Sequence, residues 1–217
     1  MVSGTVIAID GPAASGKSSV ARLLAARLGL AYVNSGAMYR AVTWWMLRRG
    51  ADADCPESVL PLLPEMRMKC GLENGVSTLR MDGADPGSAL FEEVVNQNVS
   101  AIARIPEIRR ILVERQREYA RNCDLVMEGR DIGSVVFPDT PYKFYIDASP
   151  DVRARRRASQ GQRDSITDRD RADTSRKASP LTIAEDAYVI DSSNLTIDGV
   201  VGEIIGRLKL KGLEVPG

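Results

Sequence analysis

The chain has 217 residues, 44% hydrophobic and 27% charged, and its 29 basic residues balance its 29 acidic ones. This composition is typical of a folded protein with one sizeable core, and the length is short for two full domains. The absence of histidine excludes histidine acid–base catalysis and histidine-ligated metals, and the zero net charge gives no reason to expect a nucleic acid partner.

The cysteines and the apolar segments indicate where the protein works. Cys55, Cys70 and Cys123 lie far apart and form neither a metal-ligand spacing nor a disulfide framework, which favours a reducing compartment. No apolar run approaches the roughly 20 residues that cross a membrane, and the first ten residues lack the features of a signal peptide. We therefore expect a cytoplasmic protein with no membrane partner, and, since no exposed apolar stripe stands out, a monomer.

Five short apolar runs are expected to form strands. They do not alternate between apolar and polar residues, which is typical of strands buried on both faces of a parallel sheet. The runs are TVIAID (5–10), AYVNS (31–35), DLVMEGRD (124–131), KFYIDAS (143–149) and YVIDSS (188–193). Helical periodicity lies between them, in 17–29 with Gly29 as its end and in 106–120 with Pro106 as its start. Strands alternating with helices predict an α/β fold.

Residues 66–87 break this alternation. They contain short strand-like pieces and turn signals at Asn74-Gly75 and Asp82-Gly83, which predict a small antiparallel insertion. The residues alone leave open whether this insertion is functional or a decorative β excursion.

The segment GPAASGKS (11–18) matches the P-loop pattern G-x-x-x-x-G-K-[ST], directly after a predicted strand and at the start of a predicted helix. Glycines allow the backbone to curl its N–H groups around phosphate oxygens, Lys17 can reach the β- and γ-phosphates, and Ser18 can ligate Mg²⁺. The alternative is a glycine-rich turn that binds nothing. The residues expected at ATP are Gly11, Pro12, Ala13, Ala14, Ser15, Gly16, Lys17, Ser18 and Ser19.

Within the run 124–131, Glu128 directly follows the apolar residues, at the place where many P-loop enzymes carry an acidic residue. It could hold Mg²⁺ through a water molecule, or it could be an ordinary carboxylate at the end of a strand.

Four motifs in order, GPAASGKSS (11–19), NSGAMYR (34–40), EGRDIGSVVFPD (128–139) and RDRADTSRKASPL (169–181), closely resemble the bacterial cytidylate kinase family. The resemblance covers nearly the whole chain and implies transfer of the γ-phosphoryl group of ATP to CMP or dCMP, with Mg²⁺. It also implies an α/β fold with a five-stranded parallel core. The implied parts are a P-loop core (1–34, 96–148 and 182–217), a monophosphate-binding region with the antiparallel insertion (35–95), and a lid (149–181).

The resemblance assigns arginines to the phosphates, which such a reaction needs because it brings several negative charges together. It implies that Arg40 and Arg130 hold the CMP phosphate and that Arg169 and Arg176 come over from the lid. We expect these four arginines and Lys17 to be the catalytic residues, with Arg176 also contacting CMP.

Cytosine presents two acceptors and one amine donor on its Watson–Crick edge. Arg109 can donate to the acceptors and Asp131 can accept from the amine. The resemblance adds Ser35 and Ser100 at the base and Asp173 at the ribose. Plainer interpretations remain open for three of these residues: Ser35 as a helix N-cap, Arg109 as a surface arginine, and Ser100 as a helix-surface serine.

The charged run 167–180 has two interpretations. Arg169, Asp173 and Arg176 share one helical face, which suits both a phosphate-facing lid and a surface ion-pair stripe. The other three motifs favour the lid. At its entry, Arg153, Arg156 and Arg157 are candidates for contact with ATP, and Arg156 is placed in the predicted ATP site. The lid is shorter than usual in the family, since only GQRDSI separates RRRASQ from TDRD.

Two other functions compete with this one. A kinase for a different nucleoside monophosphate would keep the P-loop and change the base contacts. An ATP-sensing switch would bind a partner without turnover, but it has no need of a second phosphate site with its own arginines.

Overall fold

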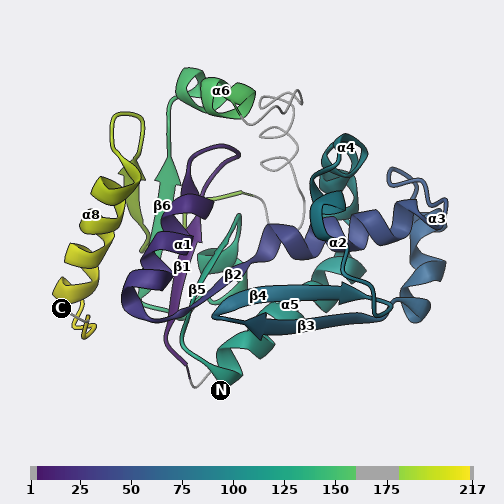
Figure 1. Cartoon of the computed structure of the whole chain (residues 1–217), viewed down its shortest axis with the longest axis horizontal. Helices are drawn as coiled ribbons and strands as arrows, with labels where there is room; N and C mark the ends of the chain where they lie inside the picture. Colours follow the sequence, from purple (N-terminus) through teal and green to yellow (C-terminus); the bar gives the residue numbers. More distant parts are fainter. Residues whose placement is uncertain (1–3, 160–180, 216–217) are drawn as a thin grey trace.

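The computed structural model of the protein describes residues 4–159 and 181–215. These residues contain one sheet with the strand order β3-β4-β2-β5-β1-β6-β7 (Figure 1). The strands are β1 (Val6–Asp10), β2 (Ala31–Asn34), β3 (Met68–Glu73), β4 (Val76–Met81), β5 (Leu125–Gly129), β6 (Tyr142–Asp147) and β7 (Tyr188–Asp191). The α-helices are α1 (Lys17–Leu28), α2 (Ser35–Leu47), α3 (Pro56–Val59), α4 (Glu93–Ile102), α5 (Pro106–Asn122), α6 (Pro150–Ser159) and α8 (Ile197–Leu210).

The five predicted apolar runs form β1, β2, β5, β6 and β7, which pair in parallel as expected. The five-stranded parallel core is confirmed, whereas the whole sheet has seven strands in the described residues. The difference comes from the insertion at 66–87. Its strands β3 and β4 pair with each other antiparallel, and β4 joins the edge of the sheet through the parallel pair Tyr32–Val76.

The sheet is buried on both faces, which explains the unbroken apolar runs. In β1, Val6 and Ala8 pack into one core cluster, whereas Ile7 and Ile9 pack into the other. Helices α1 and α8 cover one face of the sheet, and α2, α4 and α5 cover the opposite face (Figure 1). The predicted helices at 17–29 and 106–120 are confirmed as α1 and α5.

The predicted turns are also confirmed. Asn74 and Gly75 connect β3 to β4 with φ angles of 51° and 74°, the left-handed pair that a two-residue hairpin turn requires. Asp82 and Gly83 follow β4 with φ angles of 51° and 83°. The described residues also contain three short helical segments: the 3₁₀ helices η1 (Leu60–Glu65) and η2 (Gly87–Phe91) and the π-helix η3 (Ile132–Val136).

Parallel pairing brings the carboxyl ends of β1, β2 and β5 to one edge of the sheet. The P-loop follows β1, the NSGAMYR segment opens α2 after β2, and Arg130 and Asp131 follow β5. This edge is where α/β sheets place their ligands. Within the residues that the structure describes, no helix has both the length and the apolar character needed to cross a bilayer.

Candidate active site

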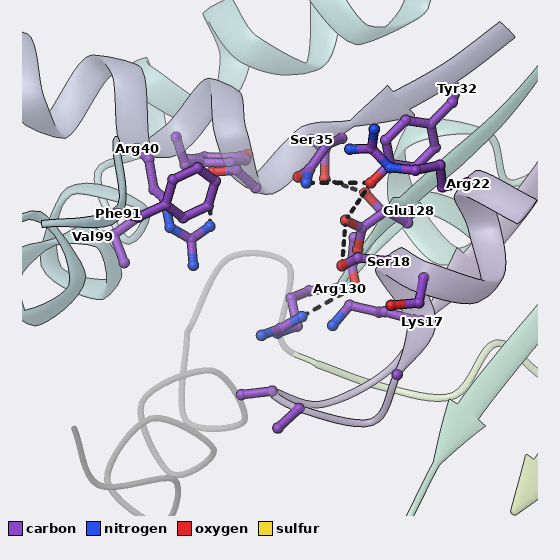
Figure 2. A pocket seen from close by; sticks show the side chains of 18 of the residues that line it. Lys17, Ser18, Arg22, Tyr32, Ser35, Arg40, Phe91, Val99, Glu128 and Arg130 are labelled. Carbon is purple, nitrogen blue, oxygen red and sulfur yellow. Dashed lines mark hydrogen bonds between the residues drawn. The ribbon is translucent and has the colours of Figure 1, made fainter. Parts of the chain in front are cut away.

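A cleft of about 760 Å³ lies at this edge of the sheet. It is lined by the P-loop, by the start of α2, by α4 and by the segment that follows β5. Figure 2 shows Lys17, Ser18 and Arg130 on one side of the cleft, with Arg40 and Phe91 across from them. The motifs at 11–19, 34–40 and 128–139 therefore meet in one place, as a shared site requires.

The P-loop has the backbone shape that its glycines predict. Gly16 has a φ of 90°, in the left-handed region, and it caps the amino end of α1. Gly11 lies so close to β6 that a Cβ atom would sit 2.1 Å from the carbonyl oxygen of Ile146. Lys17 is buried, and its Nζ donates to the carbonyl oxygen of Pro12 at 2.9 Å. The loop is thus built as an anion cradle at a helix N-terminus.

Ser18 and Glu128 meet across the cleft floor. The Ser18 hydroxyl donates to Glu128 Oε1 at 2.7 Å, and the Tyr32 hydroxyl lies 3.3 Å from the same oxygen (Figure 2). Glu128 is buried at the end of β5, with 3% of its surface exposed. A hydroxyl and a carboxylate oxygen held side by side are hard oxygen donors that suit Mg²⁺.

Two arginines bring positive charge from opposite sides of the cleft. Arg130 Nη1 donates to the carbonyl oxygen of Gly11 at 2.9 Å, so this guanidinium lies directly against the P-loop. On α2, Arg40 Nη1 donates to the carbonyl oxygen of Gly36 at 3.2 Å, and the Phe91 ring centre lies 5.7 Å from the Arg40 guanidinium carbon. Both side chains line the cleft together with Lys17.

Arg109 is not a surface arginine. Its side chain forms a buried ion pair with Asp131, and the two side chains are only 5% and 7% exposed. A hydrogen bond from Arg109 Nη1 to the carbonyl oxygen of Ala103 at 3.1 Å fixes the guanidinium further. The pair joins α5 to the segment after β5 and lines the cleft. A paired donor and acceptor set in a buried wall can read the edge of a planar base.

The two serines lie on the same cleft with different partners. Ser35 is buried and donates to the carbonyl oxygen of Glu128 at 2.8 Å. Ser35 is not the N-cap of α2; Asn34 has that role, since its Oδ1 accepts from the backbone N–H of Ala37 at 3.0 Å. Ser100 lies on α4, half-buried, and lines the cleft.

The arginines of α6 have distinct positions. Arg156 donates to the carbonyl oxygens of Ser15 and Ser192 at 3.1 and 2.8 Å, which ties α6 to the outside of the P-loop. Arg153 reaches the carbonyl oxygen of Ala13 at 3.4 Å. Arg157 is buried and lines the cleft. The lid candidates Arg169, Asp173 and Arg176 lie outside the described residues.

The sequence interpretation missed two aromatic residues of the cleft. Tyr39 lies on α2 with its ring centre 5.5 Å from the guanidinium carbon of Arg109, and Phe91 lies beside Arg40. Tyr39 is contained in the NSGAMYR motif, where attention to its flanking positions could have found it. Phe91 has no comparable signal, because the short 3₁₀ helix η2 lies outside all four motifs.

Comparison with known proteins agrees with the motifs. The family model "Cytidylate kinase" matches residues 7–210. A protein named cytidylate kinase from Pelotomaculum thermopropionicum is 44% identical, over 93% of this chain and 95% of its own length. One of the same name from Streptomyces avermitilis is 39% identical, over 97% and 95% of the two chains. The P-loop, the buried Arg109–Asp131 pair and these similarities lead to one conclusion: the chain belongs to the cytidylate kinase family.

Proposed function

We propose that this protein transfers the γ-phosphoryl group of ATP to CMP or dCMP, giving ADP and CDP or dCDP, with Mg²⁺ bound to the phosphates. The observation that carries the proposal is that one cleft contains both a P-loop and the buried Arg109–Asp131 pair. A P-loop alone would support any nucleotide-binding protein. A buried donor–acceptor pair in the same cleft supports a kinase whose acceptor is a nucleotide.

The donor side of the cleft would hold ATP. The P-loop N–H groups and Lys17 would bind its phosphates, and Arg157 would add a further positive charge from α6. Arg156 would support this site by holding Ser15 in place through its hydrogen bond to the Ser15 carbonyl oxygen. Mg²⁺ would bind the Ser18 hydroxyl directly and Glu128 through water, and it would neutralise charge on the β- and γ-phosphates.

The acceptor side would read cytosine. Arg109 would donate to O2 and N3 of the base, and Asp131 would accept from its exocyclic amine. The Arg109 guanidinium is held by Asp131 and by the carbonyl oxygen of Ala103, so it would meet the base in a fixed orientation. Ser35 and Ser100 would add contacts from the neighbouring helices.

Positive charge would then stabilise the transferring phosphoryl group. Arg40 and Arg130 would hold the CMP phosphate from two sides, which would place its oxygen opposite the γ-phosphate. The remaining arginines, Arg169 and Arg176, would close over the phosphates from a lid at 149–181, and Asp173 would contact the ribose. The regions 1–34, 96–148 and 182–217 would then act as the fixed core against which 35–95 and the lid close.

We further propose that the protein works in the cytoplasm as a monomer. Three separated, unpaired cysteines support a reducing compartment. A cleft whose two subsites are both lined by residues of one chain is compatible with a monomer.

An acceptor panel tests the function. ADP release would be followed with Mg·ATP and CMP, dCMP, UMP, AMP or GMP, and also without acceptor. We expect rapid turnover on CMP and dCMP and only background without acceptor. Turnover on a purine nucleotide alone would support the rival kinase and contradict the base assignment, and ATP binding without any acceptor turnover would support the switch.

A further inference from the structure

Asp10 occupies a position that the proposed reaction does not use directly. It is the last residue of β1, immediately before the P-loop, and its side chain is buried. Its Oδ1 accepts from the backbone N–H of Ile132 at 2.8 Å, and its Oδ2 accepts from the N–H of Gly133 at 2.8 Å. Each carboxylate oxygen therefore holds one of two consecutive backbone N–H groups at the start of η3.

These hydrogen bonds fix the segment that carries two acceptor-site residues. Arg130 and Asp131 lie directly before Ile132, and Arg130 also donates to the carbonyl oxygen of Gly11. Two adjacent residues at the end of β1 and the start of the P-loop, Asp10 and Gly11, thus hold the backbone and the side chain on either side of Asp131. The position of the CMP-binding segment relative to the P-loop is set by these contacts.

Burying the ionised Asp10 side chain costs desolvation free energy. Burial raises the pKa of Asp10 to about 7, despite the two backbone hydrogen bonds that lower it. The negative charge of Asp131 raises this pKa further, and the Lys17 ammonium lowers it. A buried carboxylate is tolerated where both of its oxygens are needed, because a neutral side chain would avoid the desolvation cost.

We propose that Asp10 is a positioning residue for phosphoryl transfer, which aligns the segment of Arg130 and Asp131 with the P-loop. The inference rests on the proposed function. Asp10 is not among the described residues that line the cleft, so it would act through its neighbours. In-line transfer depends steeply on alignment, and a displacement of about 1 Å can cost roughly 100-fold in rate.

The substitution Asp10→Asn tests this role with almost no change in volume. Asn keeps one acceptor oxygen but turns an NH₂ group toward the second backbone N–H, so one of the two hydrogen bonds is lost. We expect kcat with CMP to fall by about 10- to 100-fold and the Kd of CMP to rise several-fold. The Kd of ATP should stay within about twofold, and at pH 8, where Asp10 is ionised, the melting temperature should not fall, because a buried charge is removed.

Asp124→Asn is the matched control. Asp124 also accepts a backbone hydrogen bond, from the N–H of Thr5 at 2.5 Å, but it is exposed and lies before β5, at the opposite end of the sheet. We expect its kcat and both Kd values to equal those of the wild type.

Gly133→Ala tests the same contact from the other partner. A Cβ atom at Gly133 would lie 3.1 Å from Lys143 Cγ, which is tighter than an ordinary contact, and 3.4 Å from Asp10 Oδ2, which is an ordinary one. Crowding against Lys143 would therefore displace the Gly133 backbone, whose N–H donates to Asp10. It should reproduce the selective loss of CMP binding and kcat, and it replaces Asp10→Asn if that variant does not fold.

Two results would overturn the inference: wild-type kcat and CMP binding in these variants, or an equal loss of ATP and CMP binding with a lower melting temperature. CMP turnover by the wild type distinguishes a failure of the positioning role from a failure of the proposed function. A wild type that does not phosphorylate CMP contradicts the function itself, whereas an active wild type with unaffected Asp10 and Gly133 variants contradicts only the positioning role.

Discussion

The Ser18 hydroxyl donates to Glu128 Oε1 at 2.7 Å, which joins the P-loop helix to the end of β5 across 110 residues of sequence. This contact predicts that the two side chains serve one Mg²⁺ ion. Glu128→Gln should raise the Mg²⁺ concentration for half-maximal turnover and lower kcat by roughly 10-fold, because the amide binds a metal-bound water less strongly than the carboxylate.

A Mg²⁺ titration at saturating ATP and CMP measures this. Glu203→Gln is the matched control, since Glu203 accepts from the Tyr188 hydroxyl at 2.8 Å on the far side of the protein. An unchanged Mg²⁺ dependence in Glu128→Gln would leave Glu128 as an ordinary strand-end carboxylate.

Lys17→Ala should lower kcat by about 100- to 1,000-fold, because it removes the ammonium group that stabilises the negative charge on the transferring phosphoryl group. Lys209→Ala, an exposed lysine on α8, should have wild-type kinetics. Steady-state rates of ADP release with CMP provide the comparison, and near-normal turnover in Lys17→Ala would contradict the catalytic role of the P-loop.

The buried Arg109–Asp131 pair should affect the free energy of unfolding and the turnover of CMP in different ways. Arg109→Met alone leaves the Asp131 carboxylate buried without its guanidinium and should cost about 3–5 kcal/mol in the free energy of unfolding. The double variant Arg109→Met/Asp131→Leu removes both charges and should recover most of that stability. Its turnover of CMP should remain lost.

Urea unfolding and CMP turnover on the three proteins test this separation. If the double variant recovered turnover together with stability, the pair would have only a structural role.

The pKa of Asp10 predicts how stability depends on pH. Burial raises this pKa from 3.8 to about 7, so between these values the folded protein binds a proton that the unfolded chain has released. This protonation favours the folded state, and the contribution is lost as pH rises through about 7. The groups that face Asp10 are Asp131, Lys17 and the stem of Lys143 beside Gly133.

Between pH 5 and pH 8, the free energy of unfolding of the wild type should therefore fall by a few kcal/mol relative to that of Asp10→Asn. Urea unfolding of both proteins at the two pH values measures the difference. A constant difference would show that Asp10 does not titrate in this range.

The parts of the fold that follow from local pattern could be predicted, and those that depend on long-range packing could not. The run TVIAID is apolar on both sides because β1 is covered on both faces, so its parallel environment could be read from its residues. No local pattern predicted that β4 would join the same sheet, because this depends on long-range contacts such as the pairing of Tyr32 with Val76.

In the candidate site, too, local pattern predicted some features and long-range packing determined the others. The order of the motifs predicts that Lys17, Ser18, Arg130 and Asp131 lie close together, because residues that follow parallel strands meet at one edge of the sheet. All four line one cleft. The distinct positions of Arg156 and Arg157 could not be derived from the sequence, because two adjacent residues on α6 differ only by the rotation of the helix against the P-loop. The sequence also could not identify the N-cap of α2, since Asn34 and Ser35 are both residue types that favour this position.

The central claim is that the Arg109–Asp131 wall selects cytosine for phosphoryl transfer, and the ratio of kcat/KM for CMP to that for UMP tests it most directly. In UMP a carbonyl oxygen replaces the amine, so Asp131 would face an acceptor. The wild type should prefer CMP by at least about 10-fold, and Asp131→Asn, whose amide can donate to that carbonyl, should shift the ratio toward UMP. A wild type without preference, or an Asp131→Asn variant with an unchanged ratio, would contradict the assignment of this wall to the base.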